Sequence, residues 1–224
     1  MTLRAHGLTR RYQRGTRPVT ALSTVDLELS PGELAVAAGP SGSGKTTLLS
    51  LLAGLDTPDA GTVDTVPPLP PGVPPAALGW RDLAFVPQSA TLLEELTVRE
   101  NVALPVRLAP GTPPVNIDEL LDRLDLAHLG ARYPSQVSGG EQQRTAIARA
   151  LVLSPHVLLA DEPTGHQDRV RVHRGVLTVL RAHAYAGHTV LLSSHDEDVI
   201  AGADRLLRLV DGRLAGDARP AART

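Results

Sequence analysis

The sequence contains no cysteine, a single lysine and few aromatic residues. Its 224 residues include one Trp, one Phe and three Tyr, and every long cationic side chain other than Lys45 is an arginine. Without cysteine, the chain has neither disulfides nor thiolate metal sites, which suits a cytosolic protein. The length fits one domain or a domain with a subdomain, and it allows a substantial core.

The chain also lacks a strong charge of either sign and any long apolar run. It has 22 basic and 24 acidic residues, a net charge of −2, so no nucleic-acid partner is expected. The residues after Met1 do not resemble a secretory signal. The longest uncharged stretch, Thr65 to Trp80, contains six prolines and cannot form a membrane helix, which needs roughly 20 apolar residues. We expect a chain that is soluble by itself, does not insert into a membrane and meets membranes only through a partner.

Strand-like and helix-like segments alternate along the chain. From Thr97 to about Leu153 the apolar periodicity is helical, with Asn116 and Glu119 as an expected capping pair. Strands alternating with helices predict an α/β fold with a doubly wound sheet. The segments that we expect to form strands are 3–12, 25–29, 33–38, 62–66, 82–86, 157–160 and 189–192.

The single lysine lies in a glycine-rich segment that predicts a phosphate-binding loop. The pattern G-x-x-x-x-G-K-[ST] lets successive backbone N–H groups converge on phosphates, because glycine permits unusual torsions and close approach. An ammonium is a compact point charge, whereas a guanidinium is a planar fork, which accounts for a lysine here. Lys45 would reach the β- and γ-phosphates, Thr46 would ligate Mg²⁺, and Thr47 would help hold the α-phosphate. The alternative is a Gly/Ser-rich turn without a ligand. The segment reads Gly39, Pro40, Ser41, Gly42, Ser43, Gly44, Lys45, Thr46.

Two further motifs follow at intervals. Ser138, Gly139 and Gly140 offer a hydroxyl and exposed N–H groups where a helix begins, which predicts a second anion site. Taken alone, the same residues would suit an ordinary helix cap. Asp161 and Glu162 end a short apolar run, as charged residues do at the carboxyl end of a central parallel strand. A solvated acidic pair is the alternative.

In this order and spacing, the motifs resemble the ATP-binding cassette (ABC) ATPases over nearly the whole chain. The resemblance implies one ABC ATPase domain, residues 1–224, with RecA-like parallel strands in a mixed sheet and an antiparallel β subdomain. Residues 1–87 and 156–224 would form the catalytic core, and residues 88–155 a helical subdomain that carries the signature sequence. It also implies ATP and Mg²⁺ as cofactors and ATP hydrolysis as the activity.

The resemblance further implies a homodimer, or a pair of cassettes, that forms on ATP binding. Ser138, Gly139, Gly140 and Glu141 of one copy would close over ATP held by the other. Asp168 would contact the partner cassette. His166 and Gln167 replace a more common Asn/Ala-Leu pair, so closure is expected to be weaker or differently tuned.

The remaining site residues are assigned by the same resemblance. Asp161 would hold Mg²⁺ through water, and Glu162 would orient and deprotonate the attacking water, a role worth about 10²–10⁴ in rate. Gln88 would touch Mg²⁺ and sense the γ-phosphate, which His195 would also contact. Tyr12, which lies 27 residues before Gly39, would stack on adenine, and the alternative is a core tyrosine.

Several phrases narrow the resemblance to the lipoprotein-releasing, macrolide-export and cell-division group. They are Gly54 to Pro58, Glu100 to Pro105 and Asp161 to Gly165. Such a cassette would energise a separate integral membrane permease, in a transporter or mechanotransmission complex, from the cytoplasmic face of the cell membrane. The proline-rich segment 67–75 lacks the strand and glycine turn that relatives tend to have, and Trp80 is expected to be a packing residue.

Two other classes of function remain as alternatives. A soluble ABC ATPase of DNA repair or translation usually carries coiled-coil insertions, two cassettes or a basic groove, and this sequence shows none of them. A kinase or GTPase would leave Ser138 and His195 unexplained, and a chain with one lysine in its phosphate loop has no guanine-reading Asn-Lys-x-Asp.

Overall fold

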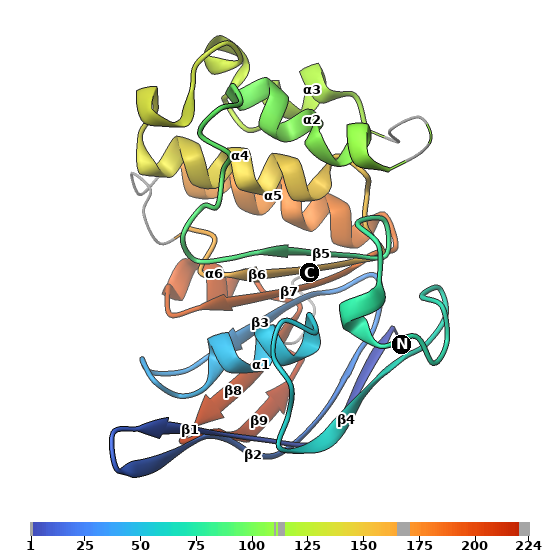
Figure 1. The fold of residues 1–224 in the computed structure, drawn as a ribbon, viewed down its shortest axis with the longest axis vertical. Helices are drawn as coiled ribbons and strands as arrows, with labels where there is room; N and C mark the ends of the chain where they lie inside the picture. The colour runs from blue at the N-terminus through green and yellow to red at the C-terminus, as the bar shows by residue number, and fades with distance from the viewer. Residues whose placement is uncertain (1, 110, 112–114, 165–170, 220–224) are drawn as a thin grey trace.

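The computed structural model describes residues 2–109, 111, 115–164 and 171–219. Within these residues the chain forms two sheets with helices between and above them (Figure 1). The larger sheet has the order β5-β6-β7-β3-β8-β9, and the smaller has the order β2-β1-β4. The predicted α/β fold is therefore confirmed.

The strands and helices have the following bounds. The strands are β1 (Leu3–Arg14), β2 (Arg17–Leu29), β3 (Leu34–Ala38), β4 (Ala60–Thr65), β5 (Leu83–Val86), β6 (Val157–Asp161), β7 (Thr189–Ser194), β8 (Arg205–Val210) and β9 (Arg213–Ala218). The helices are α1 (Lys45–Leu52), α2 (Val98–Leu108), α3 (Ile117–Arg123), α4 (Gly139–Leu151), α5 (Arg171–Tyr185) and α6 (Glu197–Ala201). Short 3₁₀ turns are η1 (Pro75–Ala77), η2 (Ala127–Leu129) and η3 (Pro134–Gln136).

The larger sheet is parallel from β5 to β8, and only β9 runs antiparallel. Every residue of β3, β6 and β7 is buried, because helices or the smaller sheet cover both faces. Parallel strands place their carboxyl ends at one edge of the sheet. The loops that follow β3, β5, β6 and β7 therefore meet at this edge.

Two apolar cores lie on the two faces of this sheet. Alternate residues of β3 divide between them: Leu34 and Val36 pack with α2 to α5, whereas Ala35 and Ala37 pack with α1 and the smaller sheet. Figure 1 shows α4 and α5 above the sheet and α1 below it. The four leucines predicted to line the helix after the phosphate loop are buried in the second core; they are Leu48, Leu49, Leu51 and Leu52.

One local prediction is wrong. Asn116 does cap α3, but its side chain accepts a hydrogen bond from the Asp118 backbone N–H, and Glu119 takes no part in the cap. A reciprocal capping box forms one helix earlier, where Thr97 accepts from the Glu100 N–H and the Glu100 carboxylate accepts from the Thr97 N–H. Both patterns have an acidic residue at the third helical position, so the sequence alone does not separate them.

The proline-rich segment is an extended loop that is anchored at both ends. Leu69 is 1% exposed, so the loop contributes a side chain to the second core. The Thr65 hydroxyl lies 2.8 Å from the Pro70 carbonyl oxygen and 2.9 Å from that of Val73, so one donor serves both acceptors. The segment is thus part of the domain and does not link two domains.

Three histidines gather at the amino ends of β6 and β7. The rings of His183 and His188 stack with centroids 4.2 Å apart, and His156 lies 6.0 Å from His188. Nε2 of His183 is 3.0 Å from the Pro155 carbonyl oxygen, to which it donates. Burial, with His188 and His156 nearby, lowers the pKa of His183 to about 4.

This histidine makes stability depend on pH. His183 stays neutral in the folded chain but takes up a proton in the unfolded chain below its ordinary pKa of about 6.5. Its contribution to stability is complete above that pH and is lost as the pH falls toward about 4. We expect His183→Gln, which keeps a donor for Pro155, to flatten the fall of the melting temperature between these pH values. An unchanged slope would contradict the assignment.

Candidate active site

The phosphate loop connects β3 to α1 and is packed too closely for side chains at two glycines. A Cβ on Gly39 would lie 2.2 Å from the Leu209 carbonyl oxygen, and one on Gly44 would lie 2.4 Å from that of Ala21. Gly44 also has φ +102°, in the left-handed region. The β1–β2 pairing shifts register next to Ala21, which lies between the paired residues Leu22 and Thr20. The smaller sheet thus touches and shapes the loop.

Lys45 is folded onto the loop that it ends. It is 6% exposed, and its Nζ donates to the carbonyl oxygens of Gly39 at 2.8 Å and Pro40 at 3.1 Å. An ammonium has three donors, so one remains for a ligand oxygen. Gly44 caps α1 without a side-chain hydrogen bond, so the first N–H groups of the helix receive no cap and can meet an anion.

The other residues of the loop differ in exposure. Ser41, Gly42 and Thr46 are exposed, and Thr47 is half-buried. Ser43 is 3% exposed, and its hydroxyl has no hydrogen-bond partner among the described residues. Thr46 can therefore present its hydroxyl oxygen to a ligand that enters from solvent.

Asp161 is the last residue of β6, and Glu162 directly follows it. Asp161 is 2% exposed and accepts a hydrogen bond from the Ser193 hydroxyl on the neighbouring strand β7. The Glu162 N–H donates to the same hydroxyl oxygen at 2.9 Å. Glu162 has φ +43°, a left-handed conformation that side chains other than glycine rarely adopt. Such backbone geometry is common at functional sites.

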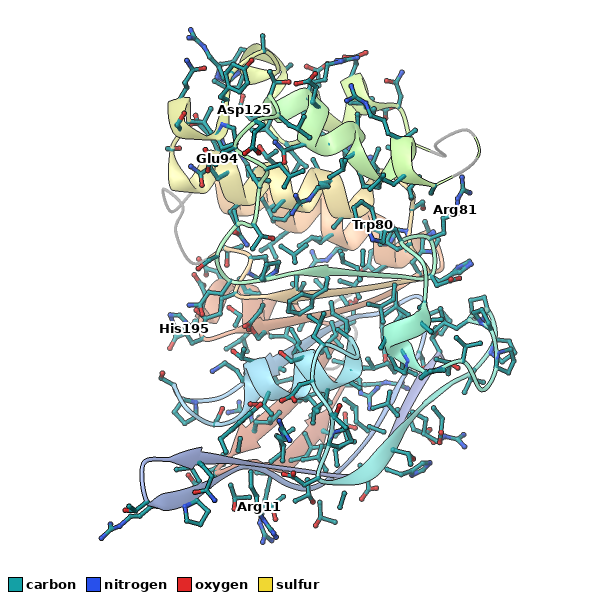
Figure 2. The ribbon with its side chains drawn as sticks, in the orientation of Figure 1. Arg11, Trp80, Arg81, Glu94, Asp125 and His195 are labelled. Carbon is teal, nitrogen blue, oxygen red and sulfur yellow. The ribbon has the colours of Figure 1, made fainter. Side chains whose placement is uncertain are left out.

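The Glu162 carboxylate brings three of the predicted site residues together. Its Oε1 lies 3.1 Å from Nδ1 of His195, and its Oε2 lies 3.4 Å from Nε2 of Gln88. Gln88 follows β5, Glu162 follows β6 and His195 follows β7, so three adjacent strands supply them. Figure 2 shows His195 at the edge of the sheet, and its side chain is 69% exposed. A carboxylate, an imidazole and an amide thus meet at this edge of the sheet.

The serine-glycine motif begins α4 and is a complete helix cap within this chain. Ser138 accepts from the Glu141 N–H, and the Glu141 carboxylate accepts from the Ser138 N–H at 2.7 Å. That bond lowers the pKa of Glu141. Gly139 has open space where a Cβ would lie. In Figure 1, α4 and α1 lie on opposite sides of the larger sheet, so this motif does not face the phosphate loop of its own chain.

Tyr12 lies near the tip of the β1–β2 hairpin and is 40% exposed, which does not fit a core tyrosine. Its hydroxyl donates to Asp56 Oδ2 at 2.7 Å and lowers the pKa of that carboxyl. Arg10 lies over the ring, 4.9 Å from its centroid, and also donates to Asp56. The contacts of Asp56 with Arg10 and Tyr12 could not be predicted from local patterns, because they join segments that are distant in the sequence.

Trp80 is not the packing residue that was expected. It is 44% exposed and, with other apolar side chains, lines a groove of about 670 Å³ between β5, the end of α1, α2 and α4. Figure 2 shows it at the level between the sheet and α2. The groove extends to Pro87, whose carbonyl oxygen accepts from Nε2 of the buried Gln143 on α4. Other residues that line it are Leu55, Leu93, Leu104, Ala150 and Leu153.

The predicted magnesium ligands have suitable chemistry. Thr46, Gln88 and Asp161 offer hydroxyl, amide and carboxylate oxygens, and Mg²⁺ prefers oxygen. The described part of the chain contains no group of three or more His, Cys, Asp or Glu side chains that could hold a metal.

Asp168, His166 and Gln167 lie outside the described residues. Among the helices that the structure describes, none has the length and apolar character needed to cross a membrane.

Sequence comparisons place the chain among transport proteins. A family model described as ABC transporter matches residues 22–165. The lipoprotein-releasing system ATP-binding protein LolD of Chromohalobacter salexigens is 39% identical, over 96% of this chain and 94% of its own length. LolD of Pseudomonas syringae pv. tomato is 40% identical over 95% and 96%. The macrolide export ATP-binding/permease protein MacB of Nitrosomonas europaea is 40% identical, over 94% of this chain but 33% of its own length.

Solved structures give the same result. The dimeric structure of a post-hydrolysis state of the ATP-binding cassette MJ0796, bound to ADP and Pi, superposes with a TM-score of 0.84 at 30% identity. The superposition covers 97% of this chain and 98% of the MJ0796 chain. A second dimeric structure of MJ0796, described as a bacterial ABC transporter cassette, has a TM-score of 0.85.

The close packing at Gly44 leads to a prediction. Gly44→Ala would put a methyl group against the Ala21 carbonyl at a strained φ, so we expect nucleotide binding to weaken at least about tenfold, which corresponds to about 1.4 kcal/mol. Gly187→Ala is the matched control, because its φ is +95° but nothing lies within 4 Å of the added Cβ. Equal nucleotide affinity in the two variants, measured by titration calorimetry, would show that the contact is unimportant.

Proposed function

The chain belongs to the ABC transporter family, as its motifs predicted, and we propose that it is the ATP-hydrolysing subunit of a lipoprotein-releasing type of transporter. It would act at the cytoplasmic face of the membrane through a separate permease. The observation that carries the catalytic part is the Glu162 carboxylate, held 3.1 Å from His195 and 3.4 Å from Gln88 at the edge where the phosphate loop lies.

In the proposed site, the phosphate loop binds the phosphate groups of ATP. Lys45 turns a donor toward the β- and γ-phosphates, the N–H groups of the loop and of α1 point at phosphate oxygens, and Thr47 helps hold the α-phosphate. Tyr12 stacks on adenine. Thr46, Gln88 and, through water, Asp161 would hold Mg²⁺, and the bound ion would neutralise phosphate charge and polarise the γ-phosphate.

Hydrolysis follows from the position of Glu162. Its carboxylate orients a water molecule in line with the γ-phosphate and accepts a proton as the oxygen attacks phosphorus. The bond to the bridging oxygen of ADP breaks, and the electron pair leaves with ADP. The His195 imidazole contacts a γ-phosphate oxygen and stabilises charge that develops there. Gln88 senses whether the γ-phosphate is present.

The site is completed by a second copy. The Ser138 hydroxyl and the N–H groups of Gly139 and Gly140 begin α4, which lies on the other face of the sheet from α1 (Figure 1). This separation within one chain supports the proposal that they meet a triphosphate held by another chain. Glu141 and Asp168 join this contact in the proposed dimer. ATP then closes the pair, and hydrolysis opens it.

The groove beside Trp80 is the proposed docking site for the permease. Three of its apolar side chains are strongly exposed: Leu55 at 64%, Trp80 at 44% and Leu93 at 45%. An apolar groove of this kind suits an amphipathic helix. The groove extends to Pro87, and the next residue, Gln88, donates to the Glu162 carboxylate. A shift of the bound helix could therefore move Gln88 and change its contact with Glu162. Residues 88–155, the proposed helical subdomain, form most of the upper wall.

The first test removes the base. Glu162→Gln keeps the shape of the side chain but cannot accept the proton, so we expect ATP turnover to fall about 10²–10⁴-fold while ATP still binds. Glu197→Gln is the control, because Glu197 is exposed and only two residues from His195. Phosphate release and nucleotide binding are the measurements. Turnover of the Glu162 variant at the wild-type rate would remove this residue from the mechanism.

The second test addresses the partner. Trp80→Asp would put a charge into the apolar groove, so we expect at least about tenfold less permease to be recovered with the tagged chain from native membranes. Leu108→Asp is matched, since Leu108 is 69% exposed but does not line the groove. Equal recovery with both variants would contradict the docking site. Recovery of ribosomes or nucleic acid instead of a multi-span protein would support the alternative of a soluble ABC ATPase.

A further inference from the structure

Ser193 is a polar residue at a position where the sheet would accept an apolar one. It is 0% exposed near the end of β7, after the wholly apolar Val190, Leu191 and Leu192. In the β6–β7 register it lies directly opposite Asp161. A buried hydroxyl in a core strand is costly unless it is bonded. Packing alone therefore does not account for the serine.

The Ser193 hydroxyl makes two hydrogen bonds, to consecutive residues of the neighbouring strand. It donates to Asp161 Oδ1, and it accepts from the Glu162 N–H at 2.9 Å. A hydroxyl has one donor, so its proton is committed to the Asp161 carboxylate. One atom on β7 thus fixes both the side chain of Asp161 and the backbone of Glu162.

The second bond acts on a strained residue. Glu162 has φ +43°, which is disfavoured for a residue with a Cβ and persists only when its surroundings hold it. Without Ser193, the Glu162 N–H would lose its partner. The peptide could then relax, and the direction of the Glu162 side chain would change with it.

His195 directly follows the strand that supplies Ser193. Nδ1 of His195 lies 3.1 Å from Glu162 Oε1, so β7 contacts the Glu162 backbone and the residue after β7 contacts its carboxylate. The neighbouring hydroxyl is used differently: Ser194 accepts from the Asp196 N–H at 3.0 Å, at the start of α6. Of these two neighbouring hydroxyls, that of Ser193 is the one that bonds to Asp161 and Glu162.

We propose that Ser193 is a positioning residue for ATP hydrolysis, whose hydroxyl holds Asp161 and Glu162 in the geometry that Mg²⁺ binding and water activation require. This rests on the proposed function of that site. Ser193 is 0% exposed, so it is not placed to contact ATP or the attacking water directly. It acts through the two acidic residues, so its loss should affect turnover and Mg²⁺ dependence more than the binding of ATP itself.

The main test is Ser193→Ala in the full chain. We expect kcat to fall about 10–100-fold, as for other residues that orient a metal ligand, with the KM for ATP within roughly threefold of wild type. The Mg²⁺ concentration for half-maximal activity should rise. Binding of ATP in the absence of Mg²⁺, followed by titration calorimetry, should stay within roughly twofold, a result that general damage to the fold would not give.

Two sets of control variants separate position from stability. Thr189→Val removes another buried hydroxyl of β7, which is bonded to Thr2 Oγ1 at 2.7 Å at the far end of the strand. It should lower the melting temperature but leave kcat and Mg²⁺ dependence unchanged. Ser193→Thr and Ser193→Val have the same shape and differ only by the hydroxyl, so the Thr variant should be the more active of the two.

A kcat for Ser193→Ala within about twofold of wild type would overturn the proposal. If that variant does not fold, the Thr and Val variants decide: equal activity of the two, high or low, removes the hydroxyl from the mechanism. The ATPase activity of the wild-type chain separates failure of the proposed function from failure of the Ser193 proposal. A wild type that does not hydrolyse ATP contradicts the proposed function, whereas an active wild type with an unaffected Ser193→Ala contradicts only the role of Ser193.

Discussion

The site depends on the parallel pairing of β5, β6, β7 and β3. Because these strands run in one direction, the residues that follow them meet at a single edge, although they lie far apart in the sequence. The pairing places Gln88, Glu162 and His195 just after three adjacent strands, where Gln88 lies 3.4 Å and His195 lies 3.1 Å from the Glu162 carboxylate. The same register sets Ser193 opposite Asp161. A shift of one residue in the pairing of β6 with β7 would turn the Ser193 side chain away from Asp161.

The two faces of this sheet are the structural basis for our proposal that a second copy completes the site. The phosphate loop begins α1, which packs in the core shared with the smaller sheet, and the Ser138 motif begins α4, which packs in the other core. Within one chain, Ser138 is satisfied as an ordinary cap by Glu141. The motif is therefore capped without a ligand, and Ser138 and Gly139 are exposed at the start of α4. The groove beside Trp80 is lined in part by α4 and extends to Pro87. The Pro87 carbonyl oxygen accepts a hydrogen bond from Gln143 of α4.

Periodicity and glycine patterns predicted most of the fold, because they report local geometry. The apolar run 157–160, the strand 33–38 and the phosphate loop were all placed correctly. The errors lie where the decisive contact is distant or where two local patterns look alike. The sequence around Trp80 does not indicate that its side chain is exposed, because the groove that it lines is formed by separate segments between Ala53 and Leu153. Ser193 could have been found only by pairing β6 with β7, since a serine after an apolar run has no signal of its own.

The central claim is that ATP held by one copy is capped by Ser138 and its glycines from another. Light scattering of the Glu162→Gln chain, with and without ATP, tests it most directly, because slow turnover preserves the bound state. The account predicts that ATP doubles the scattering mass, and that Ser138→Arg abolishes the doubling while one chain still binds ATP. Hydrolysis at the full rate by wild-type protein whose mass remains that of a single chain would contradict it.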